Sequence, residues 1–172
     1  MTINPVTDPT LIVLIGVAGS GKSTLAAARW RPAQVLSLDA LRELVSDDEC
    51  DQAATRDAVA VLHALAAARL SRRLTTVVDA TNVDAGVRLA LTKLAESRGM
   101  PAVAIVVDTP IAICQARNAT RTGRRTGARW GRRVPTDVID AQHQQLRAAL
   151  PRLRAEGFAE VLVHELGPEA VR

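Results

Sequence analysis

Short runs of apolar residues alternate along the chain with longer stretches in which apolar positions recur every three or four residues. The short runs predict buried strands at about residues 10–15, 34–37, 74–78, 102–107 and 159–164. The longer stretches predict helices that end near residue 29, begin at residue 40, and span 51–72, 85–98, 111–121 and 135–156. Pro151 predicts a kink or a break in the last helix, because proline removes a backbone donor there.

Strands and helices alternate along the whole chain, and each predicted strand is apolar on both faces. This pattern is typical of a parallel sheet covered by helices. The sequence therefore predicts an α/β fold with a parallel sheet of about five strands flanked by helices. With 172 residues, 48% of them hydrophobic, we expect a single domain over residues 1–172 and exclude general disorder.

The net charge of +4 is concentrated in residues 117–133, which we call the arginine segment. This segment contains no acid and seven arginines: Arg117, Arg121, Arg124, Arg125, Arg129, Arg132 and Arg133. The rest of the chain would carry a net charge of −3, so the segment indicates a local anionic partner. Three interspersed glycines predict that it forms a flexible, arginine-rich lid at about residues 115–135.

Residues 16–23 read Gly-Val-Ala-Gly-Ser-Gly-Lys-Ser and match the phosphate-binding pattern G-x-x-x-x-G-K-[ST]. The pattern lies between a predicted strand and a predicted helix, as its chemistry requires. Glycines let the backbone curl so that N–H groups point at phosphate oxygens, and the helix adds its positive end. Together with the alternating strands and helices, this motif predicts a P-loop phosphotransferase fold that binds a nucleoside triphosphate.

Lys22 would supply a point charge for the β- and γ-phosphates, and the Ser23 hydroxyl is a suitable oxygen ligand for Mg²⁺. Arg117 and Arg121 are four residues apart and share a helix face. Guanidinium groups on a lid stabilise the charge that develops on a transferred phosphoryl group. The predicted ATP site comprises Gly16, Gly19, Ser20, Gly21, Lys22, Ser23, Thr24, Arg117 and Arg121.

Three predicted strands end on an acid, at Asp39, Asp79 and Asp108. Ligands of open α/β sheets gather outside the carboxyl ends of the strands. Asp39 would there accept or orient the proton of an acceptor hydroxyl, and Arg42, one helical turn on, would hold an acceptor phosphate. The competing interpretation makes Asp39 the N-cap of the helix from residue 40 and Arg42 a solvated side chain.

Residues 79–82 (Asp-Ala-Thr-Asn) also allow two interpretations. Asp79 would hold the water around Mg²⁺, as Walker B aspartates do, or it would order its own loop. Thr81 or Asn82 would cap the next helix. Asp108 precedes a Thr-Pro pair, which is more typical of a turn than of a site.

These motifs occur in an order similar to that of polynucleotide 5′-hydroxyl kinases, and the chain resembles the kinase domain of bacterial RNA-repair polynucleotide kinase-phosphatases. The residues that carry the resemblance are Gly16–Ser23, Ser37, Asp39, Arg42, Asp79–Asn82, Arg88, Arg117, Asn118, Arg121, Val134 and Pro135. The resemblance extends from about Leu11 to Phe158. Because no phosphatase or ligase module follows, we expect a stand-alone kinase or a separately encoded partner of one.

The resemblance implies ATP-dependent transfer of a γ-phosphate to the 5′-hydroxyl end of RNA or DNA. It implies Asp39 as general base and Arg42 as a contact for acceptor phosphate. The implied catalytic residues are Lys22, Asp39, Arg42, Arg117 and Arg121; the implied substrate site comprises Asp39, Arg42, Asp79, Asn82 and Arg88; the implied metal site comprises Ser23 and Asp79.

Two other functions remain open from the sequence. One is a small-molecule kinase that acts on a sugar, nucleoside or antibiotic hydroxyl, since fold alone does not select the acceptor. The other is a nucleotide-gated module that binds nucleic acid through the arginine segment. A guanine-reading Asn-Lys-x-Asp motif is missing, which argues against a GTPase.

Cys50 and Cys114 belong to no metal or disulfide pattern, and the first apolar run stops within about eight residues at the glycine loop. We therefore expect reduced thiols, a cytoplasmic protein and no membrane partner. The oligomeric state stays open.

Overall fold

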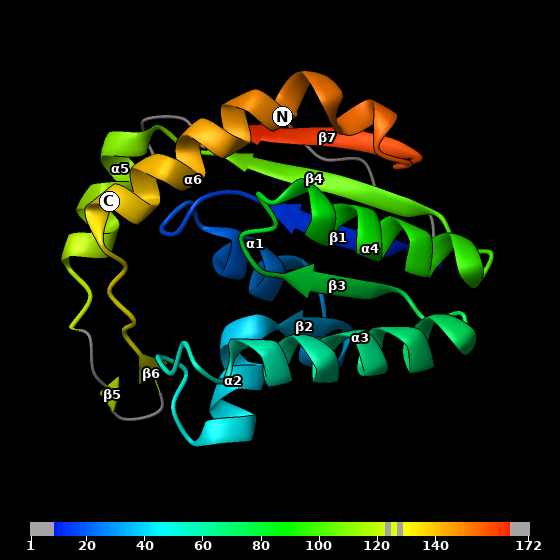
Figure 1. The fold of residues 1–172 in the computed structure, drawn as a ribbon, viewed down its shortest axis with the longest axis horizontal. Coiled ribbons are helices and arrows are strands. Elements are labelled where there is room, and N and C mark those ends of the chain that lie inside the picture. Colours follow the sequence, from blue (N-terminus) through cyan, green and yellow to red (C-terminus); the bar gives the residue numbers. More distant parts are fainter. Residues whose placement is uncertain (1–8, 123–124, 127–128, 166–172) are drawn as a thin grey trace.

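The computed structural model describes residues 9–122, 125–126 and 129–165 (Figure 1). Five parallel strands form one sheet in the order β2-β3-β1-β4-β7. The strands are β1 (Leu11–Ile15), β2 (Val35–Ser37), β3 (Thr76–Asp79), β4 (Ala102–Asp108) and β7 (Glu160–Glu165). A short antiparallel pair, β5 (Arg125–Thr126) and β6 (Arg129–Trp130), lies within the arginine segment. The predicted five-stranded parallel sheet is confirmed, whereas residues 123–124 and 127–128 of the predicted lid lie outside the described residues.

Helices connect these strands. They are α1 (Lys22–Arg29), α2 (Leu38–Ser46), α3 (Thr55–Ser71), α4 (Ala85–Ser97), α5 (Ile111–Ala119) and α6 (Thr136–Ala149), with the 3₁₀ turns η1 (Pro32–Gln34) and η2 (Leu150–Ala155). The predicted break at Pro151 is confirmed, because α6 gives way to η2 at Leu150. Within the described part of the chain, every helix falls short of the length and apolarity that a membrane crossing needs.

The residues that cap two helices differ from the predictions, and one of these helices also starts earlier than predicted, whereas α4 begins at Ala85 as predicted. Ser37, not Asp39, caps α2, because its side chain accepts a hydrogen bond from the Ala40 N–H. The helix therefore begins at Leu38, and Asp39 lies in its first turn. Asp84, not Thr81 or Asn82, caps α4 by accepting from the Val87 N–H. The carboxylate of Asp39 is thus not used as a cap.

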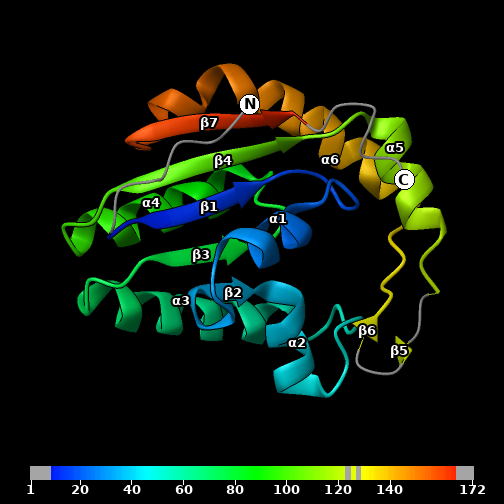
Figure 2. The same cartoon turned by 180° about the vertical axis from the view of Figure 1, so that it is seen from behind.

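The two faces of the sheet are covered unequally (Figures 1 and 2). Leu11, Val13 and Ile15 of β1 pack into the larger core with apolar side chains of α3, α4, α6 and η2. Ile12 and Leu14 point to the opposite face, where Ala26 of α1 belongs to the same smaller cluster. All five residues of β1 are completely buried, so this central strand is a rigid support for the glycine loop at its carboxyl end.

The register of the sheet brings three chain segments together at one edge. Leu14 of β1 and Ser37 of β2 both pair with Asp79 of β3. Because the strands are parallel, their carboxyl ends lie side by side. The glycine loop after β1, the start of α2 and the loop after β3 therefore converge.

Candidate active site

Residues 16–21, between β1 and α1, curl into the phosphate loop. Gly19 (φ 83°) and Gly21 (φ 101°) adopt the left-handed conformation that glycine tolerates. Space restricts Gly19 further, since a Cβ atom there would lie 2.5 Å from the carbonyl oxygen of Cys114 on α5. Gly21 precedes α1 as its N-cap and offers no side-chain cap, so the N–H groups of the first helical turn suit a phosphate.

Lys22 is buried at the centre of this loop, with 7% of its surface exposed. Its Nζ donates hydrogen bonds to the carbonyl oxygens of Gly16 and Val17, both at 2.9 Å. Burial lowers the pKa of Lys22 to about 8, while the carboxylates of Asp79 and Asp39 act in the opposite direction. The ammonium group is therefore held by the loop and lies within electrostatic range of two acids.

The side chains of Ser23 and Asp79 are hydrogen-bonded to each other and lie within electrostatic range of Lys22. Burial raises the pKa of Asp79, and a hydrogen bond with the Ser23 side chain and the charge of Lys22 oppose that rise. A hydroxyl and a carboxylate are the oxygen donors that Mg²⁺ uses in phosphate sites. The chemistry of this pair fits the predicted metal site.

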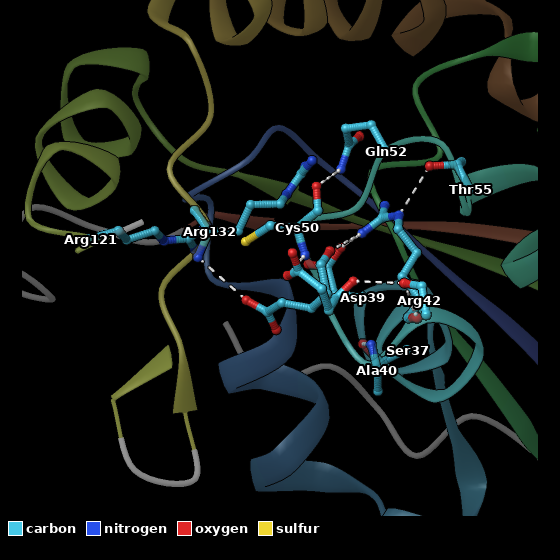
Figure 3. A network of polar contacts seen from close by, with 12 residues as sticks. Ser37, Asp39, Ala40, Arg42, Cys50, Gln52, Thr55, Arg121 and Arg132 are labelled. Carbon is cyan, nitrogen blue, oxygen red and sulfur yellow. Dashed lines mark hydrogen bonds and ion pairs between the residues drawn. The ribbon is translucent and has the colours of Figure 1, made fainter. Parts of the chain in front are cut away.

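Asp39 and Arg42 form an ion pair on α2 (Figure 3). The Arg42 Nε donates to Thr55 Oγ1 at 3.1 Å, and the Arg42 Nη1 donates to the Glu49 carbonyl oxygen at 3.0 Å. The Arg42 side chain is 5% exposed, whereas that of Asp39 is 48% exposed. A fixed guanidinium group thus orients a carboxylate that remains accessible.

The arginine segment contributes three residues near these groups: Arg117, Arg121 and Arg132. The Arg117 Nη1 lies 3.5 Å from the carbonyl oxygen of Gly19 in the phosphate loop. The Arg121 Nη1 donates to the Arg132 carbonyl oxygen at 3.1 Å. These contacts join the ends of the arginine segment to the phosphate loop and to each other.

One cavity of about 820 Å³ unites these groups. The predicted site residues that line it are Gly19, Gly21, Lys22, Ser23, Thr24, Asp39, Arg42, Asp79, Arg117 and Arg121. The volume is in the usual range of small-molecule sites. The uncapped helix start, the buried ammonium group and the paired oxygens fit a nucleoside triphosphate with Mg²⁺.

Four predicted site residues lie outside the lining of this cavity: Gly16, Ser20, Asn82 and Arg88. Gly16 and Ser20 contact the Lys22 ammonium group from within the loop. Asn82 is buried and donates from Nδ2 to the Leu14 carbonyl oxygen at 2.7 Å.

Arg88 is also buried, with 1% of its surface exposed. Its Nε and Nη2 bind the Glu156 carboxylate at 2.6 and 2.7 Å. Its Nη1 donates to the carbonyl oxygens of Asn82 and Val83. The structure thus gives Asn82 and Arg88 partners within the protein, where they brace the loop after β3.

Six further polar residues line the cavity that sequence reasoning did not assign to the site: Gln52, Thr55, Thr81, Arg132, Gln142 and His164. Gln142 of α6 accepts the Ala18 N–H at 3.0 Å across 124 residues, and no motif marks this contact. His164 lies near the carboxyl end of β7. The rule that ligands gather at the carboxyl ends of strands could therefore have indicated that it lines the site. Arg132 was marked only as one of seven arginines.

A comparison with known protein families matches residues 11–153 to the AAA domain family. The chain therefore belongs to this family, and with its five-stranded sheet it has a P-loop kinase-like fold. Such a fold implies nucleotide binding at the loop described above. A comparison with curated proteins gives no match.

Several solved structures share this fold. A candidate kinase from Chloroflexus aurantiacus is 18% identical, with a TM-score of 0.65 over 96% of this chain and 92% of that one. A chain of the Pnkp1/Rnl/Hen1 RNA repair complex is 22% identical, with a TM-score of 0.68 over 87% of this chain and 48% of that one. A gluconokinase from Sinorhizobium meliloti 1021 is 22% identical, with a TM-score of 0.54 over 96% and 87%. At these identities the likeness concerns the fold and leaves the acceptor open.

Proposed function

We propose that this protein is an ATP-dependent kinase that transfers a phosphoryl group to the 5′-hydroxyl end of a polynucleotide. The observation that carries the proposal is one cavity that is lined by the phosphate loop, by Asp39 and Arg42, and by Arg117, Arg121 and Arg132. A triphosphate site, an accessible carboxylate and several guanidinium groups are what phosphoryl transfer to a hydroxyl requires.

ATP bound with Mg²⁺ would supply the phosphoryl group to be transferred. Lys22 and the loop N–H groups would bind its phosphates, and Ser23 and Asp79 would hold the metal. Asp39 accepts the proton of the acceptor hydroxyl, and its ion pair with Arg42 orients it. Arg117 and Arg121 stabilise the charge that develops on the transferred group.

The number of arginines favours a polynucleotide over a small alcohol as acceptor. Arg121 and Arg132 line the cavity together with the Asp39–Arg42 ion pair, in addition to Lys22 and Arg117 near the phosphate loop. An acceptor with its own phosphates would use this surplus of charge, whereas a neutral sugar hydroxyl would not. The fold itself does not select the acceptor, because it is shared both with a chain of an RNA repair complex and with a gluconokinase.

The test is to offer ATP labelled at the γ-phosphate to 5′-hydroxyl RNA and DNA oligonucleotides, and separately to gluconate and nucleosides. We expect label at the oligonucleotide 5′ end. Asp39→Asn should lower the rate by roughly 10²–10⁴-fold while ATP affinity stays within about threefold. Asp47→Asn is the control, since this exposed acid lies at the far end of the same helix.

Label that enters only a small molecule would replace the proposed acceptor with a metabolite. Binding of oligonucleotide and ATP without transfer to any acceptor would instead make the protein a nucleotide-gated binding module.

A further inference from the structure

Glu49 contacts two parts of the molecule that contribute to the cavity: the Asp39–Arg42 pair on α2 and the arginine segment. It lies in the loop between α2 and α3, and its carbonyl oxygen accepts the hydrogen bond from Arg42 Nη1 at 3.0 Å. Its side chain points to a different partner, because Glu49 Oε1 accepts the backbone N–H of Arg132 at 3.3 Å. A single residue therefore contacts both the Asp39–Arg42 pair and the arginine segment.

A second hydrogen bond to Arg132 comes from another residue of the arginine segment, Arg121. The Arg132 N–H binds Glu49, and the Arg132 carbonyl oxygen accepts from Arg121 Nη1 at 3.1 Å. Figure 3 shows Arg121 and Arg132 across from Asp39 and Arg42, and Figures 1 and 2 both show β6 beside the loop that follows α2. The 83 residues between Glu49 and Arg132 make this a tertiary contact.

We propose that Glu49 is a positioning residue that holds the arginine segment against the loop after α2, so that Arg121 and Arg132 stand opposite Asp39. This inference rests on the proposed kinase function. Glu49 lies outside the cavity lining, so it acts through Arg132 and does not contact substrate. The contact fixes the positions of guanidinium groups that face the site, as transfer to a bound acceptor requires.

The electrostatic surroundings of Glu49 agree with this role. Partial burial raises the pKa of its carboxyl group, as do the nearby acids Asp39 and Glu43, while the Arg132 N–H and the charge of Arg121 oppose that rise. The carboxylate is thus partly removed from water, and the arginine segment is what compensates it. An acid placed only to keep a loop soluble would not need such partners.

The side chain of Glu49 can be tested without disturbing its backbone contact to Arg42. Glu49→Ala removes Oε1 and leaves the carbonyl oxygen in place. Glu49→Gln keeps an oxygen that can accept the Arg132 N–H. Asp47→Asn removes a charge from the same loop at an exposed position and serves as the matched control.

The first measurement is hydrogen–deuterium exchange of the full chain, read on peptides that cover residues 119–122 and 131–134. Loss of one hydrogen bond should speed exchange about fivefold in Glu49→Ala, and Glu49→Gln and Asp47→Asn should stay within about twofold of the wild type. Equal exchange in Glu49→Ala and the wild type would show that Glu49 does not hold the segment, and would overturn the proposal.

The second measurement separates ATP binding from transfer to a 5′-hydroxyl oligonucleotide. Glu49→Ala should lower kcat about tenfold and leave the Kd of ATP within about twofold, and Glu49→Gln should recover most of the rate. Faster exchange with an unchanged kcat, or an equal loss in Asp47→Asn, would reduce Glu49 to a structural residue. If the wild type transfers phosphate to no acceptor, the proposed function fails, and the exchange experiment alone decides whether Glu49 holds the segment.

Discussion

The two sides of the cavity are built in different ways. The phosphate side comes from one contiguous run, residues 16–24, in which Lys22 bonds Gly16 only six residues away. The other side, which we propose binds the acceptor and call the acceptor side, combines α2, the loop after it and the arginine segment, and it includes a contact between Glu49 and Arg132 that spans 83 residues. Lys22 is 7% exposed, whereas the Asp39 side chain is 48% exposed.

This difference separates what the fold requires from what the substrate requires. Phosphate binding uses backbone N–H groups, and their positions follow from a few glycines and the start of a helix. The acceptor side uses side chains on separate segments, which can change without loss of the sheet. Acceptor choice is therefore expected to vary among proteins that share this phosphate side.

The largest expected effect concerns Arg88, which braces the loop after β3 next to the phosphate side. Arg88→Met leaves Glu156 without its ion pair and two backbone carbonyls without a donor, which should lower the free energy of unfolding by about 3–5 kcal/mol. Urea unfolding of the purified variant measures this loss, and the double variant with Glu156→Met should recover part of it. Unchanged stability with weaker oligonucleotide binding would return Arg88 to the substrate site.

The next effect tests the centre of the phosphate side. Lys22→Met should lower the rate of phosphoryl transfer by about 10²–10³-fold, because the charge that stabilises the transferred group is lost. Lys93, the other lysine of the chain, is exposed on α4 and provides the control variant Lys93→Met. Equal losses in both variants, measured by product formation at saturating ATP, would remove Lys22 from the mechanism.

A third prediction uses the pKa of Lys22, which burial lowers to about 8 from 10.5. Between these two pH values the unfolded chain binds more protons than the folded one, so stability should rise with pH through this window. Nucleotide affinity should fall over the same range, by up to about tenfold per pH unit, as the ammonium group loses its proton.

The chain has no tyrosine, so few groups titrate in this window. Cys50 and Cys114, whose pKa values burial raises, contribute with the opposite sign. Subtracting the stability curve of Lys22→Met from that of the wild type cancels Cys50 and leaves Lys22 together with its electrostatic coupling to Cys114. Parallel curves from pH 8 to 10.5 would mean that Lys22 is not desolvated as the structure indicates.

The smallest effect concerns the acceptor side. Thr55→Val removes the oxygen that accepts from Arg42 Nε and should lower kcat/KM for the oligonucleotide about threefold to tenfold, with ATP affinity unchanged. Thr136→Val, at an exposed position on α6, is the control. A larger change in ATP binding than in acceptor use would show that the two sides are not separable.

The sequence predicted most of what local chemistry determines. The alternation of apolar runs and helical patterns predicted the five-stranded sheet, and the glycine loop was found from its own spacing. The start of α2 was predicted two residues late because Asp39 and Ser37 are both good caps, and the backbone selected Ser37.

What the sequence could not provide were contacts between distant segments. The Gln142 contact with the Ala18 N–H and the Glu49 contact with the Arg132 N–H join helices and loops that only the folded sheet brings together. The sequence also could not show which motif residues have partners within the protein. The resemblance implied that Arg88 contacts substrate, whereas in the structure it binds the carboxylate of Glu156 and two backbone carbonyl oxygens.

Position 19 has a consequence for how this chain can change over evolutionary time. A methyl group there would meet the backbone of α5, and α5 has no side chain to rearrange at that point. Drift in the surrounding sequence can alter charge, length and acceptor preference, yet this residue has no neutral replacement. The close packing of the phosphate loop against the helix that bears Arg117 is therefore preserved only as long as position 19 carries no Cβ atom.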